Sequence, residues 1–365
     1  CLSFVVTDAA TPSIHTLALR FALPVSAGGA GQRCSALRLL CLQEDVADHT
    51  LTMLRGAMAE YRTGNPEYLS TDIGPVIDDD ARRMIEEHIS AMAEKGFTVS
   101  RITHPASEKA ARLSQGHFVI PALIEIDSPA DLMQEIFGPV LHVVRYPRHG
   151  LAKVLESINS SGYGLTFGVH TRIDETIHQV TSGIHAGNLY VNRNMVGAVV
   201  GVQPFGGEGL SGTGPKAGGP LYLYRLLSSR PDDAIKVTLS HLPSLLPESE
   251  ITLPAPFVAL ASYARSHENP RLTEQCQRFA EVNQSQRVKI LTGPTGERNS
   301  YTLLPRERVL CLADTSEDAL CQLALTLCTG CRVLWPDDEL HRQWLSALPA
   351  GVSGEVDLSA SAIED

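Results

Sequence analysis

The sequence GQRCSALR, residues 31–38, places the thiol of Cys34 between a glycine, a cation and a hydroxyl. A positive charge beside a cysteine, or a nearby helix N-terminus, favours the thiolate, which is the form that attacks electrophiles. A cysteine in so short a pattern can equally be an inert buried side chain that packs as a small hydrophobe. The interpretation of the chain depends on which of these two readings the more distant motifs support.

The composition is typical of a globular protein with room for two domains. The chain has 365 residues, of which 43% are hydrophobic and 19% charged. Its formal net charge of -11 and the lack of a sustained Lys/Arg run argue against nucleic-acid binding and against a polybasic membrane contact. No apolar run reaches the roughly 18 residues of a membrane span. Eight cysteines in a chain of this size predict reduced thiols in a cytoplasmic protein.

No metal site is predicted. Cys328 and Cys331 have the two-residue spacing of a zinc or redox pair, but no second pair follows them, so core or surface cysteines are favoured. His88 lies on the apolar stripe of a predicted helix and is interpreted as a packed side chain rather than a ligand.

Short apolar runs alternate with helical periodicity along most of the chain, which predicts an α/β fold with a parallel sheet. Such sheets bind ligands at the carboxyl ends of their strands, where we expect the loop 193–214. Helices are predicted over 46–61, 80–95, 151–160, 174–181 and 317–327, with helical apolar steps at 257–264 and 272–282; strands are predicted at 118–120, 140–144, 165–171, 188–192, 288–291, 309–313 and 333–335. Asp174 is a plausible N-cap and Gly96 a plausible helix stop.

The stretch PFGGEGLSGTG, residues 204–214, is dense in glycine but has neither the GxGxxG spacing of a dinucleotide helix nor the GK[ST] ending of a Walker motif. It predicts a backbone that approaches a ligand or another loop closely, with Phe205 as an apolar wall; a flexible surface loop is the alternative. Residues 293–296, GPTG, are read as an ordinary turn rather than a phosphate-holding one.

Changes in composition suggest four segments. Residues 1–30 form an atypical N-terminal segment, 31–228 the main α/β region, 229–287 a connector with helices and 288–365 a second, smaller α/β unit. The chain opens on Cys1 without a basic region ahead of an apolar one, and we expect it to lack its own beginning.

Three motifs stand in a consistent order: GQRCS at 31–35, EIFGP at 135–139, and PFGG at 204–207 with Ser211-Gly212. Together they resemble the aldehyde dehydrogenase superfamily. The stretches NRNMVGAVVGVQPFGG at 192–207 and GTGPKAGGP at 212–220 are similar to the glutamate γ-semialdehyde (1-pyrroline-5-carboxylate) dehydrogenase part of bifunctional proline utilization A proteins. Residues 288–365 resemble the Rossmann-like C-terminal domain of the long members of that family.

The resemblance implies an aldehyde-dehydrogenase-like catalytic domain and an NAD-dependent oxidation of L-glutamate γ-semialdehyde to L-glutamate. It implies that Cys34 attacks the aldehyde and forms a thioester, and that Glu135 and Phe137 contact the nicotinamide riboside. FAD would serve only the proline dehydrogenase half, which this chain does not contain.

The resemblance also implies a set of substrate contacts. Ser35 and the backbone N-H groups of Gly197 and Ala198 would bind the substrate carboxylate, with Phe205 against its aliphatic chain. Arg33 would either add charge compensation or form a purely structural ion pair. The partners expected are a small aldehyde substrate and, in the full-length protein, further copies of the same chain in a homo-oligomer; nucleic acid and membrane are not expected.

Family features that precede the nucleophile are missing: the cofactor-binding strands, the oxyanion asparagine and the general-base glutamate. Two readings therefore remain. In one, the chain is the C-terminal portion of a proline-catabolic dehydrogenase; in the other, it is a truncated, catalytically inactive fragment or interaction module. For the isolated chain the sequence favours the second reading.

Overall fold

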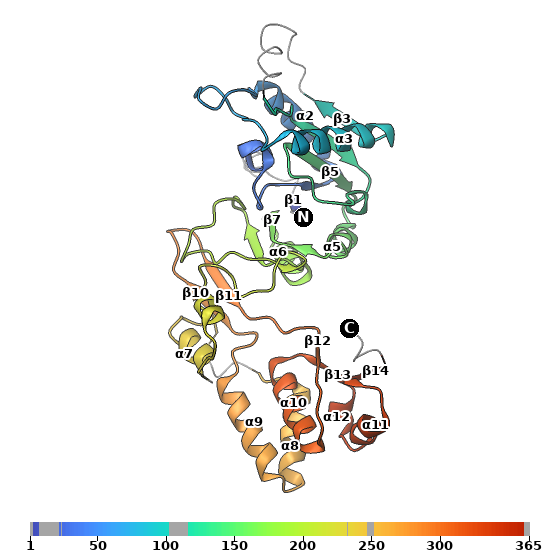
Figure 1. Ribbon diagram of the computed structural model, residues 1–365, viewed down its shortest axis with the longest axis vertical. Helices are drawn as coiled ribbons and strands as arrows, with labels where there is room; N and C mark the ends of the chain where they lie inside the picture. Colours follow the sequence, from blue (N-terminus) through green and yellow to red (C-terminus); the bar gives the residue numbers. More distant parts are fainter. Residues whose placement is uncertain are drawn as a thin grey trace. The chain divides into compact units, whose positions relative to one another are not determined.

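A computed structural model describes residues 3–6, 22, 24–101, 116–231, 233–246 and 252–360. The chain divides into two compact units, Cys1–Gly219 and Pro220–Asp365 (Figure 1). Most of the predicted N-terminal segment 1–30 lies outside the described residues. The four segment bounds proposed from composition stay predictions.

The first unit is built on a seven-stranded sheet. Its strand order is β3-β4-β5-β2-β1-β7-β8. The strands are β1 (Ser3–Val6), β2 (Leu39–Gln43), β3 (Thr98–Arg101), β4 (Ala122–Ile126), β5 (Val140–Tyr146), β7 (Thr166–His170) and β8 (Asn188–Val191). All neighbouring pairs are parallel except β3 and β4, which run antiparallel. The prediction of a purely parallel sheet is therefore wrong, because a short antiparallel edge strand makes the sheet mixed.

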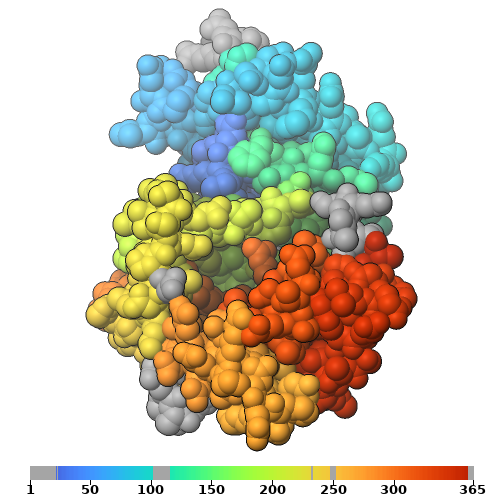
Figure 2. All heavy atoms as spheres, turned by 60° about the horizontal axis from the view of Figure 1, so that its bottom comes forward, coloured from blue at the N-terminus to red at the C-terminus, as the bar shows by residue number. Residues whose placement is uncertain are grey.

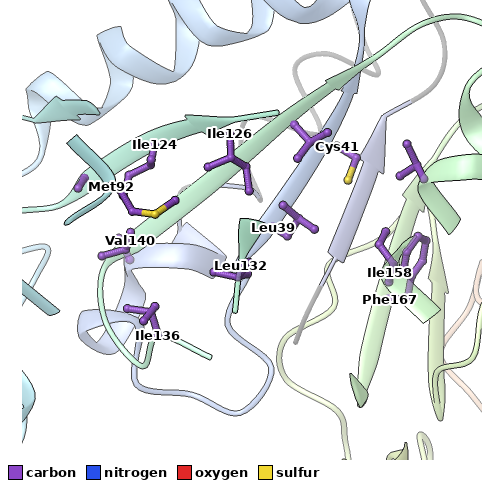
Figure 3. Close-up of a cluster of buried hydrophobic side chains, with 14 of the residues drawn as sticks. Leu39, Cys41, Met92, Ile124, Ile126, Leu132, Ile136, Val140, Ile158 and Phe167 are labelled. Carbon is purple, nitrogen blue, oxygen red and sulfur yellow. The ribbon is translucent and has the colours of Figure 1, made fainter. Parts of the chain in front are cut away.

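Successive residues of β2 point to opposite faces of the sheet and feed two cores. Leu39 and Cys41 belong to one buried cluster, drawn in Figure 3, and Leu40 and Leu42 belong to the other. Buried side chains of α2 (Glu44–Glu60) join the second cluster, whereas those of α3 (Asp79–Glu94), α5 (Leu151–Asn159) and α6 (Asp174–Gly183) join the first. The sheet is thus covered by helices on both faces.

The predicted helices of this unit are confirmed to within two residues at each end. The Asp78 side chain accepts a hydrogen bond from the Ala81 amide at the start of α3, and Gly96, with φ +90°, follows the last turn. Asp174 was predicted to be the N-cap of α6, and this prediction is wrong. Asp174 lies in the first turn, and Ile173 is the N-cap. An acidic residue is also favourable there, because the helix N-terminus carries partial positive charge.

The prediction of a strand at 118–120 is wrong, since the strand of this region is β4 and begins after Pro121. A two-stranded antiparallel pair, β6 (Tyr163–Gly164) with β9 (Glu208–Gly209), ties the glycine-rich loop to the start of β7. The turn η1 (Gly28–Gly31) precedes the Cys34 loop, and η2 (Pro129–Asp131) precedes the Glu135 loop.

The second unit has a three-stranded parallel sheet and a separate hairpin. The sheet consists of β12 (Arg308–Leu310), β13 (Arg332–Pro336) and β14 (Val356–Ser359), and the hairpin of β10 (Val288–Leu291) and β11 (Asn299–Thr302). Residues 293–296 lie in the hairpin connection, where the Glu297 amide donates to the Pro294 carbonyl at 3.1 Å. The ordinary-turn prediction therefore agrees with their position.

The helices of the second unit are η3 (Tyr222–Leu226), α7 (Ala234–Ser240), α8 (Ala255–Ser266), α9 (Pro270–Val282), α10 (Ser316–Thr329), α11 (Glu339–Ser346) and α12 (Ala350–Ser353). Side chains of α8 and α9 share one buried cluster with α10 and Trp335 of β13. The orange and red segments accordingly form one continuous body in Figure 2. Although part of the predicted connector, α8 and α9 contribute to the core of the α/β unit.

The described residues show neither a membrane-spanning helix nor a cluster of metal ligands. None of their helices has the length and apolar character required to cross a membrane. Among the same residues, no group of three His, Cys, Asp or Glu side chains is arranged to hold a metal ion. Cys328 and Cys331 are both buried, within and just after α10.

Candidate functional site

The Cys34 loop connects η1 to β2. Cys34 and Arg33 are exposed, whereas Ser35 is only 7% exposed. Three backbone hydrogen bonds shape the loop: the amides of Gln32, Ala36 and Leu37 donate to the carbonyls of Gly29, Arg33 and Val25, respectively. The sequence analysis considered a helix N-terminus near Cys34. In the structure the turn of Cys34 leads into a strand and not into a helix. The loop presents the thiol to solvent from a hydrogen-bonded turn.

The loop that carries Glu135 and Phe137 precedes β5. The Glu135 side chain is 27% exposed and Phe137 is 37% exposed, while Ile136 between them is completely buried. Figure 3 shows Ile136 close to Val140 in the core on one face of the sheet. Burial of Ile136 anchors the loop and leaves its two neighbours accessible.

Arg38 joins these two loops, and the sequence analysis missed it. Its guanidinium is completely buried. It donates to the carbonyls of Gly31 at 2.6 Å and Arg33 at 3.1 Å, its Nε lies 3.6 Å from Oε1 of Glu135, and its Cζ lies 4.5 Å from the centroid of the Phe137 ring. The sequence signal for Arg38 was a charged residue directly before the apolar run LLCL. If that run forms a buried strand, the arginine next to it is buried as well.

A histidine pair supports the backbone of Arg38. Both the amide and Nδ1 of His142 lie within hydrogen-bond distance of the Arg38 carbonyl, and its Nε2 lies 2.8 Å from Nε2 of His88. Burial, followed by the charge of His88, lowers the pKa of His142 to about 3. His142 is therefore neutral at physiological pH. His88 is a packed side chain, as predicted, and its partner is a second histidine.

Phe205 is positioned by a different network. The Asn188 side chain donates to the Pro204 carbonyl at 2.7 Å and accepts from the Gly206 amide at 3.0 Å. These two bonds hold the start of the glycine-rich loop against the amino end of β8. The loop 193–214 follows the carboxyl end of β8, as expected, whereas the loops of Cys34 and Glu135 precede their strands. The close approach predicted for this loop is observed, because a Cβ on Gly187 would lie 2.0 Å from the Gly206 carbonyl oxygen.

Gly197 and Ala198 follow the carboxyl end of β8. The neighbouring amides are capped: Val196 donates to Asn194 Oδ1 and Val199 donates to Gln203 Oε1, at 2.9 and 2.8 Å. Within the described part of the chain, the amides of Gly197 and Ala198 have no hydrogen-bond acceptor. Gly197 has φ +86°, a conformation that turns successive N-H groups toward one side. Two free amides are thus available to an anion.

The structure brings Arg33, Cys34 and Ser35 together with Glu135 and Phe137, through Arg38. It places Gly197 and Ala198 on one loop and Phe205 on the continuation of that loop, each held by its own polar side chain. Arg33 contributes its carbonyl to Arg38, while its side chain is exposed.

The fold and the exposed thiol define the class of this protein. Residues 4–230 match the model of the aldehyde dehydrogenase family, and the chain belongs to that family. It is 60% identical over 333 residues to the bifunctional protein PutA of Escherichia coli (strain K12), an alignment that covers 90% of this chain and 25% of the relative. It is also 38% identical over 198 residues to a 1-pyrroline-5-carboxylate dehydrogenase of Anoxybacillus flavithermus, covering 54% of this chain and 37% of the relative.

Solved structures show the same relationship. A crystal structure of bifunctional proline utilization A superimposes with a TM-score of 0.56 at 45% identity, covering 61% of this chain and 22% of that one. A 1-pyrroline-5-carboxylate dehydrogenase from Thermus with bound NAD gives a TM-score of 0.53 at 32% identity, covering 61% of this chain and 41% of that one. The chain spans about a quarter of the length of the PutA relatives it matches.

Proposed function

We propose that this chain supplies the nucleophile and the substrate-binding part of an NAD-dependent dehydrogenase that oxidises L-glutamate γ-semialdehyde to L-glutamate. The observation that carries the proposal is the exposed Cys34 thiol, held through Arg38 beside the accessible Glu135 and Phe137. The family membership and the identity to proteins named PutA and 1-pyrroline-5-carboxylate dehydrogenase support the choice of reaction.

Cys34 would act by covalent catalysis. Its thiolate adds to the aldehyde carbon, the tetrahedral adduct loses hydride, and the resulting thioester is hydrolysed to the carboxylic acid. Sulfur suits both steps, since it is a strong nucleophile and then a good leaving group. The exposure of Cys34 permits this attack without a change of the surrounding fold.

Glu135 and Phe137 fit the nicotinamide end of NAD. One carboxylate oxygen of Glu135 faces Arg38, and the side chain is partly exposed, so it can accept hydrogen bonds from ribose hydroxyls. Phe137 offers an exposed ring surface whose other face is covered by Arg38. When bound, NAD would supply the hydride acceptor; these two residues would orient its nicotinamide riboside.

The free amides of Gly197 and Ala198 fit the α-carboxylate of the substrate, because oriented backbone N-H groups bind anions. Ser35 would add a hydroxyl, and Phe205 would pack against the aliphatic chain. The exposed side chain of Arg33 is available for charge compensation. The chain would use NAD and a small aldehyde, and no metal.

Two assays of the purified 365-residue chain test the proposal. In the first, NADH formation from NAD and L-glutamate γ-semialdehyde is followed for the wild type and Cys34→Ser. In the second, alkylation of Cys34 by iodoacetamide is followed by peptide mass spectrometry with and without L-glutamate. We expect L-glutamate to slow alkylation more than D-glutamate does, because the amides of Gly197 and Ala198 would bind an α-carboxylate only in the position that the L-configuration gives it.

The outcomes separate the readings. NADH formation that requires Cys34 supports an active catalytic portion. Protection by L-glutamate without turnover supports a fragment that retains the substrate site but is inactive alone. Equal alkylation with L-glutamate, D-glutamate and no ligand, together with no turnover, would refute the proposed site in this chain.

A further inference from the structure

Arg38 is a buried cation whose partners all come from the two loops of the proposed site. The groups around its guanidinium are the carbonyls of Gly31, Arg33 and Gly138, the carboxylate of Glu135 and the ring of Phe137. Burying a charge is costly unless polar partners compensate for lost water. The position of Arg38 is therefore favourable only while both loops keep their present places.

The contacts on the Cys34 side surround the nucleophile. Arg38 binds the carbonyls of Gly31 and Arg33, and the Arg33 carbonyl also accepts the Ala36 amide, which closes the turn around Cys34. Burial lowers the pKa of Arg38, while the charges of Glu135 and Cys34 oppose that shift. Cys34 thus lies in the turn that the guanidinium holds through the Gly31 and Arg33 carbonyls.

The contacts on the other side orient both residues proposed to meet the nicotinamide. Glu135 is held by charge and Phe137 by its ring, the latter in the geometry of a cation–π contact. Ile136 fixes the backbone between them in the core seen in Figure 3. The direction of these two side chains is consequently determined by Arg38.

The two loops also meet directly. Gly31 has φ +68°, and a Cβ added there would lie 2.0 Å from the carbonyl oxygen of Gly138. Only glycine permits this approach, which places the Arg38 partners of both loops around one guanidinium. The contact at Gly31 and the bonds of Arg38 thus hold the same pair of loops, and both involve the Gly138 carbonyl oxygen.

We propose that Arg38 is a positioning residue that locks the Cys34 loop to the Glu135–Phe137 loop. The lock sets the separation between the nucleophile and the pair of side chains that would orient the nicotinamide. Its functional meaning rests on the function proposed above, whereas the lock itself is a property of the chain that can be measured without turnover.

The test uses Arg38→Lys in the full chain. Lysine retains the charge but cannot donate to two carbonyls in a planar fork or stack its head on the ring. The matched control is Arg55→Lys, since Arg55 bonds Ser100 and forms an ion pair with Glu125 away from both loops. Amide hydrogen exchange is measured for Ala36 and Gly138, whose amides bond to Arg33 and Ile136.

We expect exchange of both amides to rise at least about tenfold in Arg38→Lys and to stay unchanged in Arg55→Lys. A second readout is the alkylation of Cys34 in the presence of nicotinamide mononucleotide, the nicotinamide half of NAD. This nucleotide should slow alkylation in the wild type and lose that effect in Arg38→Lys, because the ring would no longer be held beside the thiol.

Gly31→Ala provides a second variant that leaves Arg38 intact. It should raise exchange of the same two amides by forcing the loops apart. Gly29→Ala is its control, since Gly29 also has positive φ, +66°, but a Cβ there would approach only Arg33 Nε, at 3.6 Å. Equal effects of the two glycine variants would show that backbone strain, and not the loop contact, is responsible.

Unchanged exchange at Ala36 and Gly138 in both folded Arg38→Lys and Gly31→Ala would overturn the lock. If the wild type shows no protection by the mononucleotide while exchange rises in the variants, the lock stands and the proposed role of Glu135 and Phe137 fails. If only exchange at the Cys34 loop rises, Arg38 stabilises one loop and does not connect the two.

Discussion

Arg38 of the first unit and the arginines around Asp357 of the second differ in burial and therefore in what they can do. Arg38 of the first unit is completely buried, and its partners belong to two loops that precede neighbouring strands. In the second unit, Arg308 and Arg332 share Asp357 at the sheet surface, and both arginines are about half exposed. Exposed ion pairs contribute little, because water already solvates each charge well. A buried cation instead requires its partners and so determines loop positions.

Exposed and buried thiols differ in the same sense. The second unit is centred on Trp335, which is 1% exposed and lies among aliphatic side chains and the thiols of Cys276, Cys311 and Cys328. Burial raises the pKa of all three thiols, so they are poorly reactive at neutral pH. Cys34 is exposed. The accessible Cys34 thiol thus lies in the first unit, whereas these three thiols of the second unit are packed in its core.

Truncation of Trp335 should produce the largest change in stability. Trp335→Ala removes the largest fully buried side chain and should destabilise the second unit by about 3–5 kcal/mol through lost packing and a cavity. Urea unfolding, followed by hydrogen exchange in each unit, measures the effect. Cys34 alkylation under native conditions should be unaffected; a parallel change in the first unit would show that the two cores are coupled.

Native alkylation should distinguish the exposed Cys34 from the buried thiol of Cys328 in the second unit. Burial raises the pKa of Cys328 from 9.0 to about 11, so its thiolate fraction at neutral pH is about a hundredfold below that of an ordinary thiol. We expect iodoacetamide to modify Cys34 first and Cys328 only on unfolding. Peptide mass spectrometry over time checks this, with Cys34→Ser as control. Rapid labelling of Cys328 in the folded chain would contradict the inert-core assignment.

His142, one of two buried histidines in the described part of the first unit, should make that unit sensitive to acid. Because the folded-state pKa of His142 is lowered from 6.5 to about 3, its contribution to stability is present above 6.5 and is lost as pH falls toward 3. The loss approaches about 1.4 kcal/mol per pH unit within that window. His142→Asn should reduce this slope in urea titrations of the first unit. An identical slope in His142→Asn would refute the assignment.

Helix caps should give the smallest effects and should be equal in the two units. The side chain of Asp78 accepts from the Ala81 amide, and that of Thr315 accepts from the Asp318 amide. Replacing either by alanine should cost about 1 kcal/mol, because one helix amide loses its acceptor. Thermal and urea unfolding measure both. A much larger loss at one cap would mean that its side chain has a further role in that unit.

Sequence patterns predicted the helices better than the strands. The stripes of α2 and α3 were read correctly, since a half-buried helix alternates apolar and polar residues with a clear period. Strand β2, LLCLQ, is buried at every position and has no alternation to detect. Strand β1 was missed because its place, parallel between β2 and β7, depends on partners far along the chain.

The candidate site was predicted by chemistry rather than by pattern. The motifs around Cys34, Glu135 and Phe205 each name a reactive or contacting group, and their order pointed to the aldehyde dehydrogenase family to which the chain belongs. Arg38 stands four residues from Cys34, but its only signal was a charge directly before the apolar run LLCL, which resembles any strand-flanking charge. The roles assigned to the individual site residues stay proposals.

The sequence alone determined the family, the candidate nucleophile and most helices, because these depend on residue types and on spacings of a few positions. Only the tertiary structure decided that β1 is an inner strand, that the sheet is mixed and that Arg38 faces two loops. Its contact with Gly138 spans 100 positions of the chain. A buried charge takes its meaning from the partners that surround it, and those partners are assembled only when the chain folds.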